Sequence, residues 1–268
     1  MRTKPTKRTA TGEVHPFIRT LLDGGRQWLA KFGDAATRGG VRPGPKVEVE
    51  LSLGELYQYE VFRYATRLMD LPEQLRVVAN FMVHRPRGRA IKKLGIRRGE
   101  YVSYHYRSFV VLLQTASDVA IRLTGATLAL GLNPREMKYG TVVENDWVTR
   151  WHLKAPLDRI QQVTSPLKRT RNEWIHAGEA PLIESTQTVA LVESAQHLSG
   201  GDEIWLNEQQ LEEAFDEACD ELAGQILERA KALHDAVEVL LTALQPPFGY
   251  WSRRLESDWR VVPEKKPR

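Results

Sequence analysis

The chain has 268 residues, of which 42% are hydrophobic and 27% charged, with a formal net charge of +4 and a pI near 9.1. These proportions are typical of a soluble globular protein. The single cysteine, Cys219, excludes an internal disulfide framework and a Cys-rich zinc module, and it favours a reducing cytoplasm. The most apolar stretch (109–132) is interrupted by Asp118 and Arg122, so we expect no membrane-spanning segment.

Charge is unevenly distributed along the chain. A basic run contains Arg85, Arg87, Arg89, Lys92, Lys93, Arg97 and Arg98, and a second contains Lys168, Arg169 and Arg171. By contrast, residues 202–228 hold ten acidic side chains and no basic one. Clustered lysine and arginine favour a polyanionic partner, although solvated helix faces show the same pattern.

The first half of the chain predicts helices that begin near residue 53. Residues 1–12 are rich in lysine, arginine and threonine, and we expect them to be disordered. Two breakers, Gly24-Gly25 and 38–46, flank a short segment. Residues 46–52 alternate like a brief strand, or else form an extended lead into a helix capped by Ser52. Helical spacing then predicts a helix from Leu53, a second helix that starts at Pro72 and ends at Val83, and a loop over 85–99 with at most one helical turn.

The second half predicts longer helices and one extended excursion. We expect helices over 104–130, 145–164 and 207–244, and a shorter helix that begins at Ser165-Pro166 and ends at Gly178. Residues 181–198 are rich in threonine and valine and alternate in part, which indicates a β-hairpin or extended segment.

These elements define an expected fold class and division of the chain. There is no internal repeat and no βαβ alternation, so we expect an all-α protein, an antiparallel helical bundle with a short extended or β-hairpin insertion near 181–198. We divide the chain into a basic tail (1–12), an N-terminal helical region of unassigned role (13–100), a helical bundle (101–245) and a C-terminal tail (246–268).

The stretch SPLKRTRNEWIHAGE (165–179) is the strongest candidate for chemistry. On a helix, Leu167, Thr170 and Trp174 share one face, whereas Asn172 and His176 lie almost opposite it, one turn apart. Arg169 shares the face of His176, and Arg171 lies on the flank. An outward-facing Asn/His pair beside arginines either faces water or lines a groove.

Arg171-Asn172-Glu173-Trp174-Ile175-His176 resembles the RNxxxH signature of the HEPN superfamily. The resemblance covers at most residues 100–245 and implies a helical bundle that acts as a metal-independent endoribonuclease and a dimer, as in toxins, phage-defence effectors and CRISPR-associated nucleases. It also implies that Arg171 and His176 are catalytic and that Asn172 supports the site. In HEPN toxins silenced by adenylylation a tyrosine stands two residues after the histidine; this chain has Gly178 there, so a nucleotidyltransferase antitoxin is not expected.

These residue types suit RNA cleavage because RNA carries its own nucleophile, the 2′-OH. Histidine moves protons near neutral pH, arginine neutralises the charge that grows on the phosphorus oxygens, and asparagine can orient either partner. One histidine cannot be both base and acid in one step, but two copies across a two-fold axis can, so we expect a homodimer with a composite active site. We expect no cofactor and no metal, because the other histidines lack shared metal-ligand spacing.

Further residues have supporting roles in this hypothesis. We expect phosphate contacts from Lys168, Arg169, Arg85, Arg87, Arg89, Lys92 and Lys93. Asp118 is either a solvent-edge residue of its helix or a group that holds Arg171 or His176. The expected partner is RNA, the expected location is the cytoplasm, and the expected role is a toxin or antiphage effector whose antitoxin or sensor partner is unknown. Two rival hypotheses are a non-catalytic RNA- or nucleotide-binding module and a helical interaction protein in which the motif is only a dimer seam.

Overall fold

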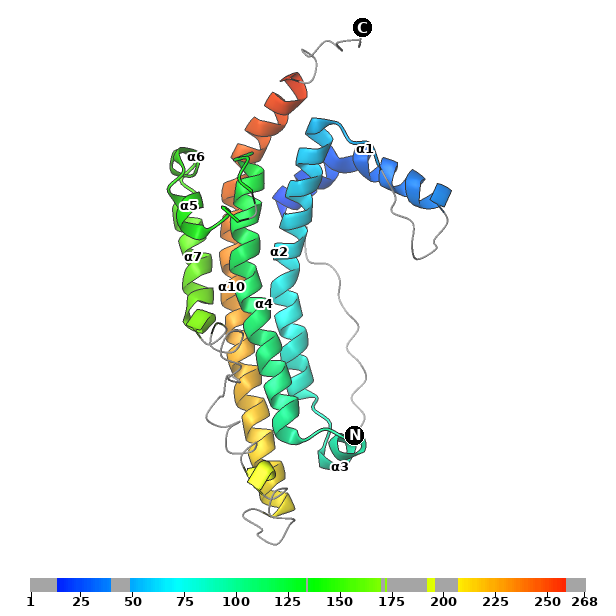
Figure 1. Cartoon of the computed structure of the whole chain (residues 1–268), viewed down its shortest axis with the longest axis vertical. Coiled ribbons are helices and arrows are strands. Elements are labelled where there is room, and N and C mark those ends of the chain that lie inside the picture. Colours follow the sequence, from blue (N-terminus) through cyan, green and yellow to red (C-terminus); the bar gives the residue numbers. More distant parts are fainter. Residues whose placement is uncertain are drawn as a thin grey trace.

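The computed structural model describes residues 14–39, 49–133, 135–169, 172, 192–195 and 207–258. Within these ranges every regular element is a helix and no strand occurs, which confirms the all-α class (Figure 1). The expected basic tail (1–12) lies outside the described residues. Most of the expected hairpin at 181–198 does too, and its described part, 192–195, is helical rather than extended.

Three long helices lie side by side and form most of the core (Figure 1). They are α2 (Leu53–Val83), α4 (Arg98–Thr127) and α10 (Glu208–Asp258). α7 (Lys154–Thr164) packs against α4 and α10, and α1 (Pro16–Gly39) lies across one end of α2. The shorter elements are α3 (Gly88–Lys93), α5 (Tyr139–Val143), α6 (Asp146–Arg150) and the 3₁₀ turn η1 (Ser165–Leu167). α2, from the region that we left without a role, therefore shares one core with α4 and α10.

Apolar side chains at helical spacing hold α2, α4 and α10 together. Leu68 and Leu75 of α2, Leu113 and Leu123 of α4, and Leu233 of α10 are all fully buried. Burying a leucine side chain contributes about 1.5–3 kcal/mol, so this seam supplies a large share of the stability. α4 is long and apolar enough to cross a membrane by composition alone, but 67% of its most apolar window is buried inside the protein. It is therefore accounted for as a core helix.

The start of α2 follows from local hydrogen bonds. Ser52 caps the helix: its Oγ accepts the main-chain N–H of Glu55 at 3.2 Å, and the Glu55 carboxylate accepts the N–H of Ser52 at 2.8 Å. Residues 49–52 have no regular structure, so the extended-lead interpretation of this stretch is confirmed there. Lys31 of α1 binds the same carboxylate at 2.7 Å, which joins α1 to this end of α2.

Several predicted breaks are wrong because packing outweighs local propensity. Pro72 does not begin a second helix but lies inside α2, since buried Leu68, Leu71 and Leu75 continue the apolar face on both sides of it. The lost main-chain bond is a local cost. Gly24-Gly25 likewise lies inside α1, where Leu21 and Trp28 are buried on either side of the pair.

Other helix ends differ from the prediction. The helix expected over 145–164 is two helices, α6 and α7, separated by a turn in which His152 has a φ of 54°. α4 starts at Arg98 rather than near residue 104. α10 continues through Pro246 and Pro247 to Asp258 instead of ending at residue 244, because buried Phe248 extends its core face.

Candidate functional site

The motif lies at the edge of the described structure. Arg171 and His176 are outside the described residues, whereas Lys168 and Arg169 just before them are exposed and Asn172 is half-buried. The helix predicted from Ser165-Pro166 to Gly178 is described only at its start, where Ser165–Leu167 form η1 and Lys168, Arg169 and Asn172 are helical. Ser165 keeps helical dihedrals (φ −60°, ψ −33°), so α7 runs directly into η1. The motif therefore follows a continuous run of backbone that α7 anchors to the core.

A polar cleft lies beside the start of the motif, between α4, α7 and the segment 137–140. Its volume is about 430 Å³, and it is lined by Gln114, Ser117, Asp118, Ile121, Met137, Lys138, Tyr139, Gly140, Gln161 and Lys168. Gln161 donates to the Ser117 hydroxyl, and Gln114 donates to the carbonyl of Thr164. These two bonds fix α7 and η1 against α4, and so fix the wall of the cleft.

Asp118 is exposed and lines this cleft together with Lys168. Its exposure agrees with the interpretation of Asp118 as a solvent-edge residue of its helix. Its carboxylate also lines the same cleft as Lys168, which precedes Arg171 by three residues in the sequence. Lys138 and Lys168 supply positive charge to the same cavity. The arrangement suits an anionic group such as a phosphate, held by lysines, with one carboxylate free to orient a neighbouring cation.

Tyr139 forms a rigid edge of the cleft. Its hydroxyl donates to Asp158, which also accepts from Lys154 at 2.7 Å. Burial, reinforced by the Asp158 carboxylate, raises the pKa of Tyr139 to about 12, so the phenol stays protonated as a donor at neutral pH. Lys154, followed by Tyr139, holds the pKa of Asp158 below its ordinary value. Within the described ranges, no group of three histidine, cysteine or acidic side chains gathers closely enough to hold a metal ion.

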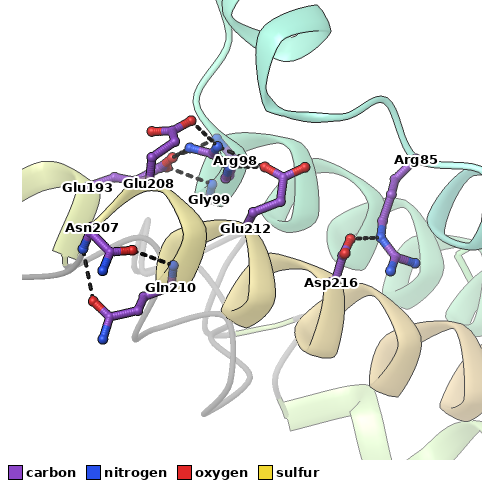
Figure 2. Close-up of polar contacts among 9 residues, drawn as sticks. All are labelled: Arg85, Arg98, Gly99, Glu193, Asn207, Glu208, Gln210, Glu212 and Asp216. Atoms are coloured by element: carbon purple, nitrogen blue, oxygen red, sulfur yellow. Dashed lines mark hydrogen bonds and ion pairs between the residues drawn. The ribbon is translucent and has the colours of Figure 1, made fainter.

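A second anchor ties the far side of the motif segment to the core (Figure 2). Glu193 accepts the main-chain N–H groups of Arg98 (3.3 Å) and Gly99 (3.0 Å) at the start of α4. The buried Arg98 guanidinium, with 3% of its side chain exposed, contacts Glu193 at 3.4 Å, Glu208 at 2.6 Å and Glu212 at 2.8 Å. Burial opposes its charge, but the carboxylates outweigh that effect and raise the pKa of Arg98. The helix ends of α4 and α10 and the segment 192–195 therefore meet at one ionic cluster.

Arg85, one of the expected phosphate-binding residues, is paired with two carboxylates. Its guanidinium donates to Asp216 at 2.5 Å and to Asp220 at 2.6 Å, both on α10 (Figure 2 shows the first contact). Burial opposes its charge, but these two carboxylates outweigh that effect and raise the pKa of Arg85. Because two carboxylates already neutralise this cation, its position supports a structural role rather than a phosphate contact.

The other predicted phosphate-binding residues of the first basic run lie near or on α3. Arg87 and Lys93 are exposed. The side chains of Arg89 and Lys92 fall outside the described part of the structure. α3 lies at the start of α4, whereas the polar cleft that Lys168 lines lies beside residues 114–121 of the same helix, so the two basic groups are separated along α4 (Figure 1).

An aromatic cluster that was not predicted from the sequence lies where α2 ends and α4 begins. His105 stacks on Phe81 of α2 (ring centroids 5.4 Å apart, planes at 24°) and meets Tyr101 and Tyr104 edge-on at 4.6 and 5.3 Å. Phe81 and Tyr104 are 55% and 67% exposed. Burial lowers the pKa of His105, so the imidazole is neutral at physiological pH. The only signal in the sequence is the density of aromatics in YVSYHY (101–106), which by itself does not distinguish surface from core.

Comparison with known proteins adds no relative. No family model matches the chain, and no curated protein and no solved structure matches it significantly. The described residues thus define an all-helical protein in which Lys168, three residues before Arg171 in sequence, lines a polar cleft.

Proposed function

We propose that this protein is a metal-independent endoribonuclease with an antiparallel helical-bundle fold of the HEPN type. It cleaves RNA by attack of the 2′-OH on the adjacent phosphate and leaves a 2′,3′-cyclic phosphate. The observation that carries the proposal is the Arg171-Asn172-…-His176 motif, placed directly after a backbone segment that borders a lysine-bearing cleft.

In the proposed mechanism each residue has one role. His176 moves the proton of the 2′-OH or of the leaving oxygen, because imidazole titrates near neutral pH. Arg171 binds the non-bridging oxygens, whose negative charge is largest in the transition state. Asn172 orients one of these two groups, while Lys168 and Lys138 hold neighbouring phosphates without reading sequence.

The reaction needs a base and an acid at the same time, so the proposal includes a homodimer. Two motifs related by a two-fold axis supply two histidines to one scissile phosphate. A cytoplasmic toxin or antiphage effector is the role that the family resemblance favours.

The first test compares wild type with two single variants, His176→Ala and Arg171→Ala, on single-stranded RNA in the presence of EDTA. We expect wild type to generate 2′,3′-cyclic phosphate ends. Each variant should lose about 100- to 1000-fold in rate, as expected for removal of a transition-state contact of about 3–4 kcal/mol. His234→Ala, an exposed histidine of α10, is the matched control and should keep full activity.

Two results would contradict the mechanism. One is cleavage that persists in His176→Ala, and the other is cleavage that EDTA abolishes. Light scattering tests the dimer independently, since an active protein that remains monomeric at assay concentration would exclude the composite site. Specific RNA binding without cleavage by wild type would instead assign the chain to the non-catalytic RNA-binding modules.

A further inference from the structure

Two exposed aromatic rings flank one imidazole where α2 ends and α4 begins. Phe81 and Tyr104 each lie within 5.5 Å of the His105 ring, from different helices, and both are more than half exposed. The Tyr101 hydroxyl donates to the carbonyl of Phe81 at 2.8 Å, which fixes α2 against α4 beneath these rings. We call Phe81, Tyr101, Tyr104 and His105 the aromatic patch. Its two outer rings face solvent, and each contacts the His105 ring.

A cavity of about 540 Å³ borders the aromatic patch along α4. Its lining includes Tyr101, Tyr104, Arg97, Ser103 and Arg107. Tyr104 and Arg107 also border a second hollow, of about 490 Å³, that continues along α4 to Val111 and Leu112. The surface beside the exposed rings is therefore hollowed along α4 rather than flat.

The charge around this surface is mixed. The cavity is lined by Arg97 and Arg107 and also by Glu100 and Glu193, and the further cations come from the neighbouring segment. Arg97 is exposed and paired with Glu100 at 2.6 Å, an exposed ion pair with which a phosphate can compete. The exposed Arg87 and Lys93 lie on or next to α3, which packs beside the same ends of α2 and α4 (Figure 1). Exposed aromatic rings interleaved with arginine and lysine are what single-stranded nucleic acids need, because bases stack on the rings while phosphates meet the cations.

We propose that the aromatic patch and the cavity beside it bind single-stranded RNA. Bases stack on Tyr104 and Phe81, and phosphates are held by Arg97, Arg87 and Lys93. This inference rests on the proposed ribonuclease function and names its substrate as unpaired RNA. A duplex fits less well because its bases are already stacked on one another and do not present their faces. Protein interfaces also favour tyrosine, phenylalanine and arginine, so a protein partner is the alternative that the binding test decides.

The same face of α4 leads from the aromatic patch towards the polar cleft. Tyr104 and Asp118 are separated by about 21 Å along the helix and by about 40° around it. Val111 and Thr115, between them, lie closer still to the direction of Tyr104. A strand stacked on Tyr104 can therefore follow α4 to the polar cleft that Lys168 lines, so that one strand spans both sites.

The test measures RNA affinity in a His176→Ala background, which prevents cleavage, by fluorescence anisotropy with a labelled mixed-sequence single strand and its duplex. We expect Tyr104→Ala and Phe81→Ala each to weaken single-strand binding about tenfold, because each loses one stacked base. Tyr104→Phe should retain affinity, since the ring remains. Leu56→Ala is the matched control, because Leu56 is an apolar residue that is 45% exposed at the other end of α2. Circular dichroism of each variant verifies folding.

Salt dependence separates stacking from phosphate contact. Arg97→Gln should reduce the slope of log affinity against log salt by about 0.7, whereas Tyr104→Ala should leave the slope unchanged. The inference is overturned if both alanine variants bind single strands as the parent does, or if duplex binds as tightly as single strand. It is also overturned if the parent binds no RNA and the substitutions change the oligomeric mass instead.

Its failure is distinguishable from that of the proposed function. If protein that keeps His176 cleaves RNA at the same rate with and without the aromatic-patch substitutions, only the inference is refuted. Binding that depends on the aromatic patch, without any cleavage, refutes the nuclease and leaves the RNA site standing.

Discussion

Replacing Arg98 with methionine tests whether the ionic cluster holds the ends of α4 and α10 together. The substitution keeps most of the side-chain length and removes the charge from a site where only 3% of the side chain is exposed. Three carboxylates, from Glu193, Glu208 and Glu212, then remain close together without their shared cation. Removing one partner of a buried ionic cluster lowers the free energy of unfolding by more than the intact pair contributes to it, because the remaining charges stay desolvated.

The exposures of the partners set the magnitude. Glu208 is 59% exposed and turns to water at little cost, while Glu193 (12% exposed) still accepts two main-chain N–H groups of α4. We therefore place the loss for Arg98→Met at about 3 kcal/mol, the lower end of the range for broken buried pairs. Arg98 and Gly99 donate to different oxygens of the Glu193 carboxylate, so Glu193→Gln keeps an acceptor for only one of the two N–H groups and should cost about 1–3 kcal/mol. Glu208→Gln should cost less than that, as exposed pairs do.

Urea unfolding followed by circular dichroism measures all three variants. A shift in midpoint at unchanged slope reports stability alone. Combining Arg98→Met with Glu193→Gln should cost less than the sum of the two, because both substitutions break the same contact. The reasoning is refuted if Arg98→Met is within about 0.5 kcal/mol of wild type, the size of an ordinary surface substitution.

Two further substitutions test the assignments of buried charge. Arg85→Met should lower stability by about 1 kcal/mol, since its partners Asp216 and Asp220 are largely exposed, yet leave RNA affinity and its salt slope unchanged; a flatter slope would return Arg85 to the phosphate contacts. His105→Phe should flatten the loss of stability between pH 7 and 5, measured by thermal melts. The folded pKa of His105 lies below its ordinary value of 6.5, so the unfolded chain takes up protons first and wild-type stability falls as pH drops below 6.5. Parallel pH profiles for the two proteins would show that His105 does not govern this loss.

Helical periodicity in the sequence correctly predicted the long core helices α4 and α10. α4 and α10 were expected because apolar residues recur every three or four positions over many turns, and such faces are buried whatever the connecting turns do. Their ends were predicted less well. Pro72 was interpreted as a boundary from local chemistry, and α10 was expected to end at residue 244, but at both places the apolar face continues. Tertiary packing supplies more free energy there than one lost main-chain bond removes.

Features of the candidate site that are contiguous in sequence could be predicted, whereas those formed by distant segments could not. The motif could be recognised because its residues are adjacent in sequence. The cleft could not, since it joins Asp118 to Lys138 and Lys168 from three segments whose proximity depends on how α7 packs. Nor could the aromatic patch, because Phe81 and Tyr104 are separated by a turn and α3 in sequence and meet only when α2 packs against α4.

The charge pattern shows most clearly what packing does to a sequence feature. The basic run at 85–98 and the acidic stretch at 202–228 looked like two independent surfaces, yet they form one interface: Arg85 meets Asp216 and Asp220, while Arg98 meets Glu208 and Glu212. Their opposite charges hold α10 against the start of α4. The cations left to meet a polyanion are therefore fewer than the run implies, and those described as exposed, such as Arg87 and Lys93, gather at α3 beside the aromatic patch. Affinity for RNA at this end must then come from stacking as much as from charge, which is why its salt slope should be shallow while its dependence on Tyr104 is steep.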